Sequence, residues 1–212
     1  MGQDRAQTAG EEIANALSHG IGLLLAIVSL PVLIVFGARQ GAVIDVVAVS
    51  VFSASMMLLY LISTLYHAMP AGTAKRWLHR LDHAVIYVFI AGSYTPFVLG
   101  VLRGAWGWSL FGLVWGMAAL GVTIKLFGRL RHPWWSTGLY VAMGWVVLLA
   151  VVPLTERMSA AGLAWLVAGG LAYTLGAVIY LFDSHRRFVH SIWHLFVLAG
   201  SVCHFFAVLW HA

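Results

Sequence analysis

The sequence predicts an all-α protein, a seven-helix transmembrane bundle. Of its 212 residues, 62% are hydrophobic and only 9% are charged, whereas soluble globular domains carry about a quarter charged residues. The charged residues divide the chain into seven stretches that contain no Asp, Glu, Lys or Arg. Each stretch can cross a bilayer once, because roughly 20 apolar residues span the hydrocarbon core as a helix. The stretches are 13–38, 46–74, 84–102, 104–124, 132–155, 158–182 and 188–212.

We expect residues 1–212 to form one transmembrane domain that begins with a short cytoplasmic N-terminal segment, residues 1–12. Ahead of the first span, Thr8-Ala9-Gly10-Glu11 has the spacing of a capping box, which predicts a helix that begins near residue 9. The later spans are joined by short connections that contain helix breakers. Small residues within the spans are expected to let helices approach closely. They are Gly112, Gly116, Gly169, Gly170 and Gly176.

The distribution of basic residues predicts the orientation of the bundle. Nine of the twelve lie in the N-terminal tail and the even-numbered connections: Arg5, Lys75, Arg76, Arg80, Lys125, Arg129, Arg131, Arg186 and Arg187. The odd-numbered connections hold the other three, and the C-terminal tail holds none. By the positive-inside rule, the N-terminus is cytoplasmic and the C-terminus is outside.

Composition also argues against several classes of protein. The net charge of +5 comes from short basic clusters between apolar spans, so we expect no nucleic-acid partner. The one cysteine, Cys203, excludes an internal disulfide and a cysteine-based metal cluster. The first residues are acidic and polar, unlike those of a cleavable signal peptide. Retinal needs a lysine inside the bundle, and the last lysine, Lys125, ends the fourth span.

Histidines from separate segments are predicted to meet near the cytoplasmic side. His190 and His194 are four residues apart at the start of the last span, so their rings share one helical face. His67 ends the second span, with Ser63 one turn before it, and Asp82 opens the third. Three imidazoles and one open position are typical of catalytic zinc, and Asp82 is suited to hold the metal's water or take its proton. The competing interpretation is an interhelical hydrogen-bond network without metal.

Further polar residues are predicted around this cluster. Glu12, Asn15 and His19 follow one another at i, i+3 and i+7, so they line one helical face at the same end. His204 lies ten residues beyond His194, which is roughly 15 Å along a helix and too deep to share one ion. We expect His204 to be a buried polar partner.

These motifs together resemble one family, the haemolysin III branch of the progestin and adipoQ receptor family. The motifs are Glu12-Ile-Ala-Asn15-x3-His19-Gly20, Ser63-x3-His67, Leu81-Asp82-His83, Ala91-Gly-Ser-Tyr-Thr-Pro96 and His190-x3-His194-x9-His204. The resemblance implies a zinc ion held by His67, His190 and His194, with Asp82 contacting the zinc-bound water and Ser63 beside it. Related adiponectin receptors and alkaline ceramidases are associated with ceramide hydrolysis, and the bacterial branch with lysis and membrane homeostasis. It also implies an integral protein of a bacterial inner membrane.

The leading functional hypothesis is a zinc-dependent hydrolase of a lipid amide or ester at the inner leaflet, with membrane lipid as its partner. Asp82 would act as general base and Ser63 would steady the developing oxyanion. Three alternatives stay open: a lipid sensor or receptor with structural zinc, a proton or ion conduit, and a cytolytic pore. Haem between two histidines also remains open on residue types alone. The oligomeric state is left undetermined.

Overall fold

The computed structural model describes residues 7–127, 132–183 and 186–211. Within these ranges the protein is helical, with seven segments long and apolar enough to cross a membrane, so the predicted fold class is confirmed. The elements in chain order are α1 (Ala9–Arg39), α2 (Val43–Ala68), α3 (Thr73–Pro96), the π-helical turn η1 (Phe97–Val101), α4 (Ala105–Leu126), α5 (Pro133–Gly144), the 3₁₀ turn η2 (Trp145–Ala150), α6 (Val151–Arg157), α7 (Ala160–Tyr180) and α8 (Val189–His211).

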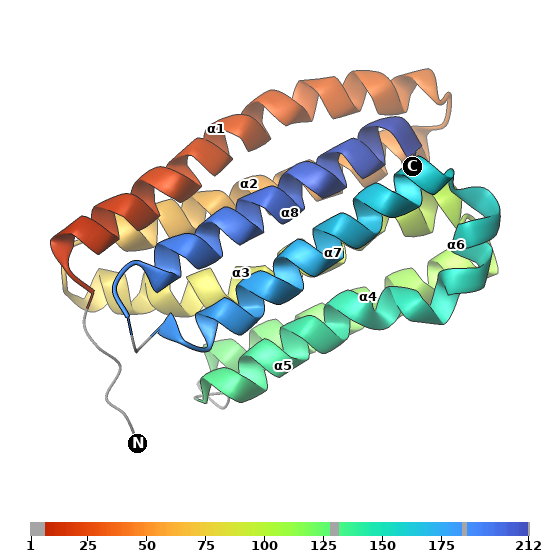
Figure 1. Cartoon of the computed structure of the whole chain (residues 1–212). Coiled ribbons are helices and arrows are strands. Elements are labelled where there is room, and N and C mark those ends of the chain that lie inside the picture. Colours follow the sequence, from red (N-terminus) through yellow and green to blue (C-terminus); the bar gives the residue numbers. More distant parts are fainter. Residues whose placement is uncertain (1–6, 128–131, 184–185, 212) are drawn as a thin grey trace.

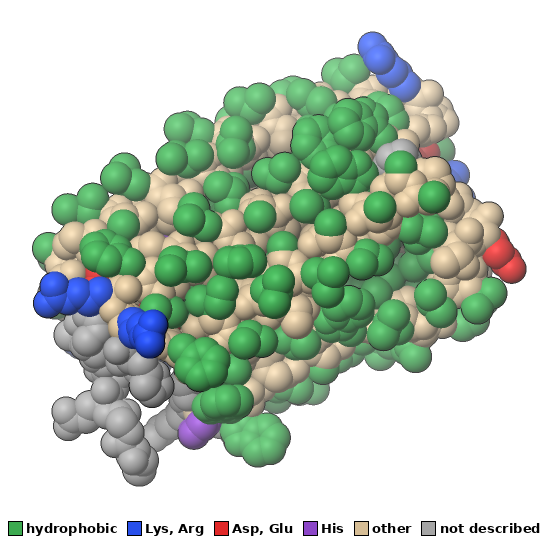
Figure 2. Space-filling view, viewed as in Figure 1, with side chains coloured by type: hydrophobic (Ala, Val, Ile, Leu, Met, Phe, Trp, Pro, Cys, Tyr) green, Lys and Arg blue, Asp and Glu red, His purple; other side chains and the backbone are tan. Residues whose placement is uncertain are grey.

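The helices lie side by side along a common axis, and α8 lies between α1 and α7 with α2 behind (Figure 1). One end of the bundle, where α1, α3, α5 and α8 begin, we call the histidine end. The start of α1 and the end of α8 are at opposite ends, as an odd number of crossings requires. Hydrophobic side chains cover the length of the face in Figure 2, and charged side chains gather at its two ends. This exterior suits lipid.

The start of α1 is fixed by the predicted capping box. The backbone N–H of Thr8 donates to Glu11 Oε2 (2.9 Å), and the N–H of Glu11 donates to Thr8 Oγ1 (3.4 Å), so the helix begins at Ala9. The other carboxylate oxygen of Glu11 accepts the N–H of Phe188 at 2.8 Å. One acidic side chain therefore caps α1 and also ties it to the residue that precedes α8.

α3 begins earlier than predicted. The apolar stretch put Asp82 at the opening of the third span, but the helix begins at Thr73, so this prediction was wrong. A membrane helix can continue into the aqueous interface, and the exposed, charged side chains of Arg76 and Arg80 on this extension suit such a position. At about 3.6 residues per turn, Asp82 lies more than two turns inside α3, where it is buried.

The fifth crossing is a broken helix, which the uninterrupted apolar stretch did not reveal. α5 ends at Gly144, and η2 separates it from α6. The hydroxyl of Tyr94 on α3 forms hydrogen bonds with the backbone groups at the break. It donates toward the carbonyl oxygens of Met143 (3.1 Å) and Gly144 (2.6 Å), and it accepts the N–H of Val147 (2.8 Å). Irregular backbone at membrane depth needs such partners, because lipid offers none.

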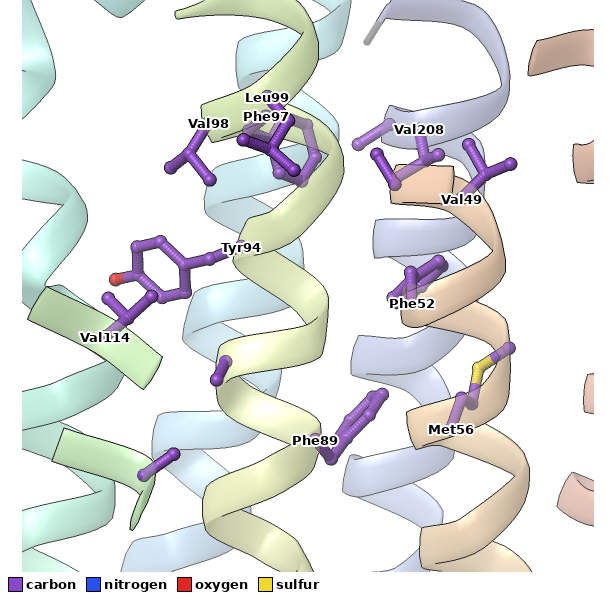
Figure 3. Close-up of a cluster of buried hydrophobic side chains, with 14 of the residues drawn as sticks. Val49, Phe52, Met56, Phe89, Tyr94, Phe97, Val98, Leu99, Val114 and Val208 are labelled. Carbon is purple, nitrogen blue, oxygen red and sulfur yellow. The ribbon is translucent and has the colours of Figure 1, made fainter. Parts of the chain in front are cut away.

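The apolar core fills the space between α2, α3 and α8. Phe52 of α2 and Phe89 of α3 point into the space between their helices, with Val208 of α8 further along it (Figure 3), and Met56 belongs to the same cluster. Phe52 and Phe89 stack with ring centroids 6.3 Å apart. Tyr94 points to the other side of α3 in this view. α3 thus has protein on both sides, which suits the placement of a polar site on it.

Glycines allow a close approach between α7 and α8. A Cβ added at Gly176 would lie 2.8 Å from the Cβ of Phe196, and Gly169 also faces α8. The prediction was wrong for Gly112 and Gly116 of α4, where an added Cβ would meet no neighbouring helix within 4 Å among the described residues. Their spacing indicates a shared helical face, but it does not tell whether that face meets protein or lipid.

We expect Gly176→Ala to destabilise the bundle by about 1–3 kcal/mol. The new methyl group would press against the Cβ of Phe196, which cannot move without its backbone. Thermal unfolding of the purified protein in detergent measures this. Gly116→Ala is the matched control, and its unfolding temperature should stay constant or rise slightly, because alanine favours a helix over glycine. Equal losses in both variants would contradict the close α7–α8 contact.

Candidate metal centre

Three buried histidines meet at the histidine end. His67 lies in the last turn of α2, and His190 and His194 lie in the first turns of α8. Their side chains are nearly inaccessible, with exposed fractions of 3%, 6% and 0%. One ligand atom from each ring lies within 4.8 Å of the other two, so the three residues can hold a metal ion. The helix pairing that builds the core therefore also brings together residues from distant parts of the chain.

Each imidazole is held by a hydrogen bond at its Nδ1 atom. Glu12 Oε2 lies 2.8 Å from Nδ1 of His67, and Asp183 Oδ2 lies 2.8 Å from Nδ1 of His190. Carboxylates only accept hydrogen bonds, so both rings donate from Nδ1 and keep the lone pair on Nε2. Such outer partners orient metal-binding histidines and raise their basicity.

The third ring has the same tautomer for a different reason. Ser18 Oγ lies 3.1 Å from Nδ1 of His194. The Ser18 hydroxyl donates its proton to the carbonyl oxygen of Asn15 at 2.9 Å. It must therefore accept from Nδ1 of His194, which again leaves the lone pair on Nε2.

The three Nε2 atoms fit a metal ion. All are buried, and none has a hydrogen-bond partner in the part of the chain that the structure describes. An interhelical network without metal would use these atoms, and the structure offers no such bonds to them. Three neutral imidazoles around an open position are the donor set of a catalytic zinc site.

Asp82 and Ser63 lie next to this cluster. Asp82, from α3, is 3% exposed and lies within electrostatic reach of His190. Ser63, one turn before His67 on α2, is 1% exposed and lies beside Asp82. Oγ of Ser63 and Oδ2 of Asp82 are buried, and neither makes a hydrogen bond of ordinary geometry with a described residue. The structure brings both near the histidines, and their catalytic roles remain predictions.

The predicted face of α1 also lines the centre. Glu12 contacts both His67 and, at 2.7 Å, Nζ of Lys75. Asn15 Oδ1 accepts a hydrogen bond, at 2.5 Å, from the hydroxyl of Ser191 on the first turn of α8. The ring of His19 stacks on His194 with centroids 3.5 Å apart and an interplanar angle of 12°. All three residues thus contact a histidine of the cluster or the helix that carries two of them.

Sequence reasoning missed three residues that support the centre: Ser18, Lys75 and Asp183. The sequence held one usable signal, since Asp183 is the one acidic residue between the sixth and seventh apolar stretches, just ahead of the histidine pair. A carboxylate so placed is a common outer partner of metal-binding histidines. No comparable signal marks Ser18, because serines are frequent in membrane helices for packing alone.

The centre lies between two hollows. A hollow of about 1310 Å³ opens at the histidine end and is lined by residues that include Glu12, His67, Lys75 and His190. A separate cavity of about 220 Å³ begins at Asp82 and His19 and extends between α3, α5, α7 and α8. Its wall is mainly aliphatic and aromatic, as in sites that bind apolar ligands. The centre therefore has a polar approach on one side and an apolar chamber on the other.

Comparison with known proteins identifies the family. The family described as "Haemolysin-III related" matches residues 7–205. The chain belongs to the haemolysin III family. The resemblance predicted from the motifs is confirmed, and a haemolysin III protein with seven apolar helical segments is an integral membrane protein.

The relatives cover nearly the whole chain. The "Hemolysin-3 homolog" of Bacillus subtilis (strain 168) is 46% identical over 204 residues, which is 96% of this chain and 95% of the relative. "Hemolysin-3" of Bacillus cereus is 44% identical over 205 residues, 97% of this chain and 93% of the relative. The human "Monocyte to macrophage differentiation factor" is 29% identical over 210 residues, 95% of this chain and 84% of the relative. No solved structure matches this haemolysin III chain.

We expect Asp183→Asn to weaken Zn²⁺ binding by roughly 10- to 100-fold, because the variant loses the carboxylate that orients His190 and raises its basicity. Competition with a fluorescent zinc chelator measures the affinity. Glu156→Gln, an exposed acidic position in α6 at the other end of the bundle, is the control and should bind as the wild type does. Unchanged affinity in Asp183→Asn would show that the metal lies elsewhere.

Proposed function

We propose that this haemolysin III protein is a zinc-dependent hydrolase that cleaves an amide or ester bond of a membrane lipid. The observation that carries the proposal is a cluster of three Nε2 atoms without hydrogen-bond partners among the described residues, close to an aspartate, Asp82, that lines an apolar cavity. Polar groups inside a membrane span are costly and usually serve a function. An apolar chamber beside them suits an alkyl chain better than a column of water or ions, which also argues against a conduit.

His67, His190 and His194 would hold the ion. Zinc bound there supplies Lewis acidity and a water whose pKa is lowered to about 7. The donor set supports zinc over calcium or magnesium, which prefer oxygen ligands. The outer partners Glu12, Ser18 and Asp183 keep each ring oriented during turnover.

Asp82 and Ser63 would act on the substrate. Oδ2 of Asp82 is uncommitted, so it can accept a proton from the attacking water and return it to the leaving nitrogen or oxygen. The hydroxyl of Ser63 can donate a hydrogen bond to the carbonyl oxygen as negative charge develops there. The cavity would hold the acyl chain and keep bulk water from the reacting carbonyl.

The polar part of the lipid would occupy the hollow at the histidine end. Lys75, Arg76 and Arg80 line this hollow, and basic residues are enriched on the cytoplasmic side of membrane proteins. We therefore propose that the histidine end faces the cytoplasm, that the N-terminus is cytoplasmic and the C-terminus outside, and that the substrate comes from the inner leaflet. The Bacillus relatives support a location in a bacterial plasma membrane.

A second candidate is a lipid sensor in which the metal is structural. It is favoured by the way the centre joins three helices, since α2 and α8 carry the histidines and α1 carries two of their hydrogen-bond partners. Lipid in the cavity would then change helix packing without being consumed. Removing the metal would lower thermal stability in both cases, so turnover decides between them.

The deciding experiment uses purified protein in lipid nanodiscs with an N-acyl sphingosine and with a diacylglycerol, and it quantifies released fatty acid by mass spectrometry. We expect release in the wild type and a loss of at least 100-fold in Asp82→Asn, because a positioned acid–base group contributes typically 10²- to 10⁴-fold. Asp45→Asn is the control, since Asp45 pairs with Arg103 at the other end of the bundle. Release that survives in Asp82→Asn would refute the assigned role.

Metal analysis of the same preparations separates binding from catalysis. We expect about one zinc per wild-type chain and strongly reduced zinc in His67→Ala, His190→Ala and His194→Ala, because each variant leaves only two imidazoles. Asp82→Asn should keep its zinc. Full zinc content in all three histidine variants would contradict the ligand set, and zinc without any release of fatty acid would favour the sensor.

A further inference from the structure

One buried histidine lies far from the metal centre, on the wall of the apolar cavity. His204 on α8 is 8% exposed and lines the cavity that begins at Asp82. Neither of its ring nitrogens has a hydrogen-bond partner among the described residues, although the sequence had suggested a buried polar partner. A buried imidazole that makes no hydrogen bond loses its hydration without compensation, so its presence calls for a ligand or a function.

The ring is held rigidly by close packing. A Cβ added at Gly169 would lie 2.3 Å from Cδ2 of His204, so the ring rests directly on the backbone of α7. Tyr173 and Phe97 present ring edges to it, with centroids 5.2 Å and 6.4 Å away. The imidazole therefore has a fixed orientation in apolar surroundings, as a specific recognition group requires.

Nearby polar groups are already used. The hydroxyl of Tyr60 donates to Ser201 (2.7 Å), the hydroxyl of Tyr173 lies 3.1 Å from the same oxygen, and Ser201 donates to the carbonyl of Val197 (3.0 Å). On the cavity wall, Nε1 of Trp145 donates to Thr174 at 3.0 Å. None of these bonds involves His204.

The backbone carbonyl of Leu166 lies near the ring, short of ordinary hydrogen-bond geometry, and is placed to attract the N–H of the neutral imidazole. A neutral imidazole then has one nitrogen left, and that nitrogen is an acceptor. The group that completes the site must consequently be a hydrogen-bond donor, such as a hydroxyl.

The other unpartnered polar atoms on the cavity wall lie near the histidine end. In the described chain they belong to His19, Asp82 and Thr137. The wall around His204 is otherwise apolar, with Phe97, Leu163 and Leu166 among its members. A ligand that forms a hydrogen bond with His204 must thus be mostly hydrocarbon. Its head would lie at the metal centre, and a second polar group, far along the chain, would reach His204.

We propose that His204 recognises a hydroxyl group on the acyl chain of the ligand, so that the cavity selects hydroxylated chains. This inference rests on the proposed function, in which the cavity holds an acyl chain with its carbonyl at the metal centre. Ten residues of α-helix separate His194 from His204, or roughly 15 Å, and an extended alkyl chain covers that length in roughly twelve carbons. The hydroxyl is therefore expected near the twelfth carbon.

The test measures binding and not turnover. Wild-type protein in nanodiscs is titrated with octadecanoic, 12-hydroxyoctadecanoic and 2-hydroxyoctadecanoic acids, and displacement of a fluorescent fatty acid gives each affinity. One hydrogen bond predicts a preference of about threefold to tenfold for the 12-hydroxy acid over the parent acid. The 2-hydroxy acid controls for polarity alone and should show no such preference.

Three variants locate the preference. His204→Leu should bind both acids with similar affinity, and His204→Gln should keep part of the preference because it retains polar atoms. Ile90→Leu, which alters the cavity wall on α3, should keep it fully. Zinc content and unfolding temperature are recorded for each variant to confirm intact protein. A preference that persists in His204→Leu would overturn the proposal.

The outcomes also separate this inference from the proposed function. If the wild type binds the parent and 12-hydroxy acids equally, the role of His204 is refuted while the acyl-chain cavity stands. If neither acid displaces the fluorescent probe, the acyl-chain cavity itself fails and the inference fails with it.

Discussion

The structure depends on a set of imidazole lone pairs that are held together inside a membrane bundle. Three hydrogen bonds, from Nδ1 of each ring to Glu12, Asp183 and Ser18, turn the remaining nitrogens toward one another. Such an arrangement is unfavourable without a ligand, because buried lone pairs lose their hydration. A metal ion held by the three Nε2 atoms would offset that cost and link α2 to α8. The outer partners are consequently as much a part of the centre as the histidines.

The remaining architecture follows from lipid as solvent. Apolar side chains face outward along the bundle (Figure 2), and apolar helices gain little by turning such surfaces toward each other when the surroundings are equally apolar. Close contact at Gly176 and the three bonds of the Tyr94 hydroxyl therefore carry much of the specificity of packing. The break that Tyr94 stabilises borders the cavity. The broken fifth crossing thus also forms part of the wall of the apolar cavity.

Much of the fold was predictable, because a long apolar stretch directly indicates a helix that spans the lipid bilayer. The seven spans and the start of α1 at Ala9 follow from apolar length and from a local capping motif. The histidine cluster was predictable because all its members sit at span ends of the same side. The early start of α3 and the break after Gly144 were not, since both depend on partners from other helices. Ser18 was missed for the same reason, because its role depends on a tertiary contact, whereas the position of Asp183 just ahead of the histidine pair was a signal that could have been used.

The link between Glu11 and Phe188 has a consequence for biogenesis. It joins the first helix to the residue just ahead of the last, and the same two helices flank the histidine cluster. During synthesis the first helix enters the membrane long before the last one emerges from the ribosome. Until translation is nearly finished, the nascent chain therefore lacks the hydrogen bond between Glu11 and Phe188 and the rings of His190 and His194. An ion bound by these rings would therefore be acquired late, and a prematurely terminated chain would leave the first helix without its partner and open to quality-control proteolysis.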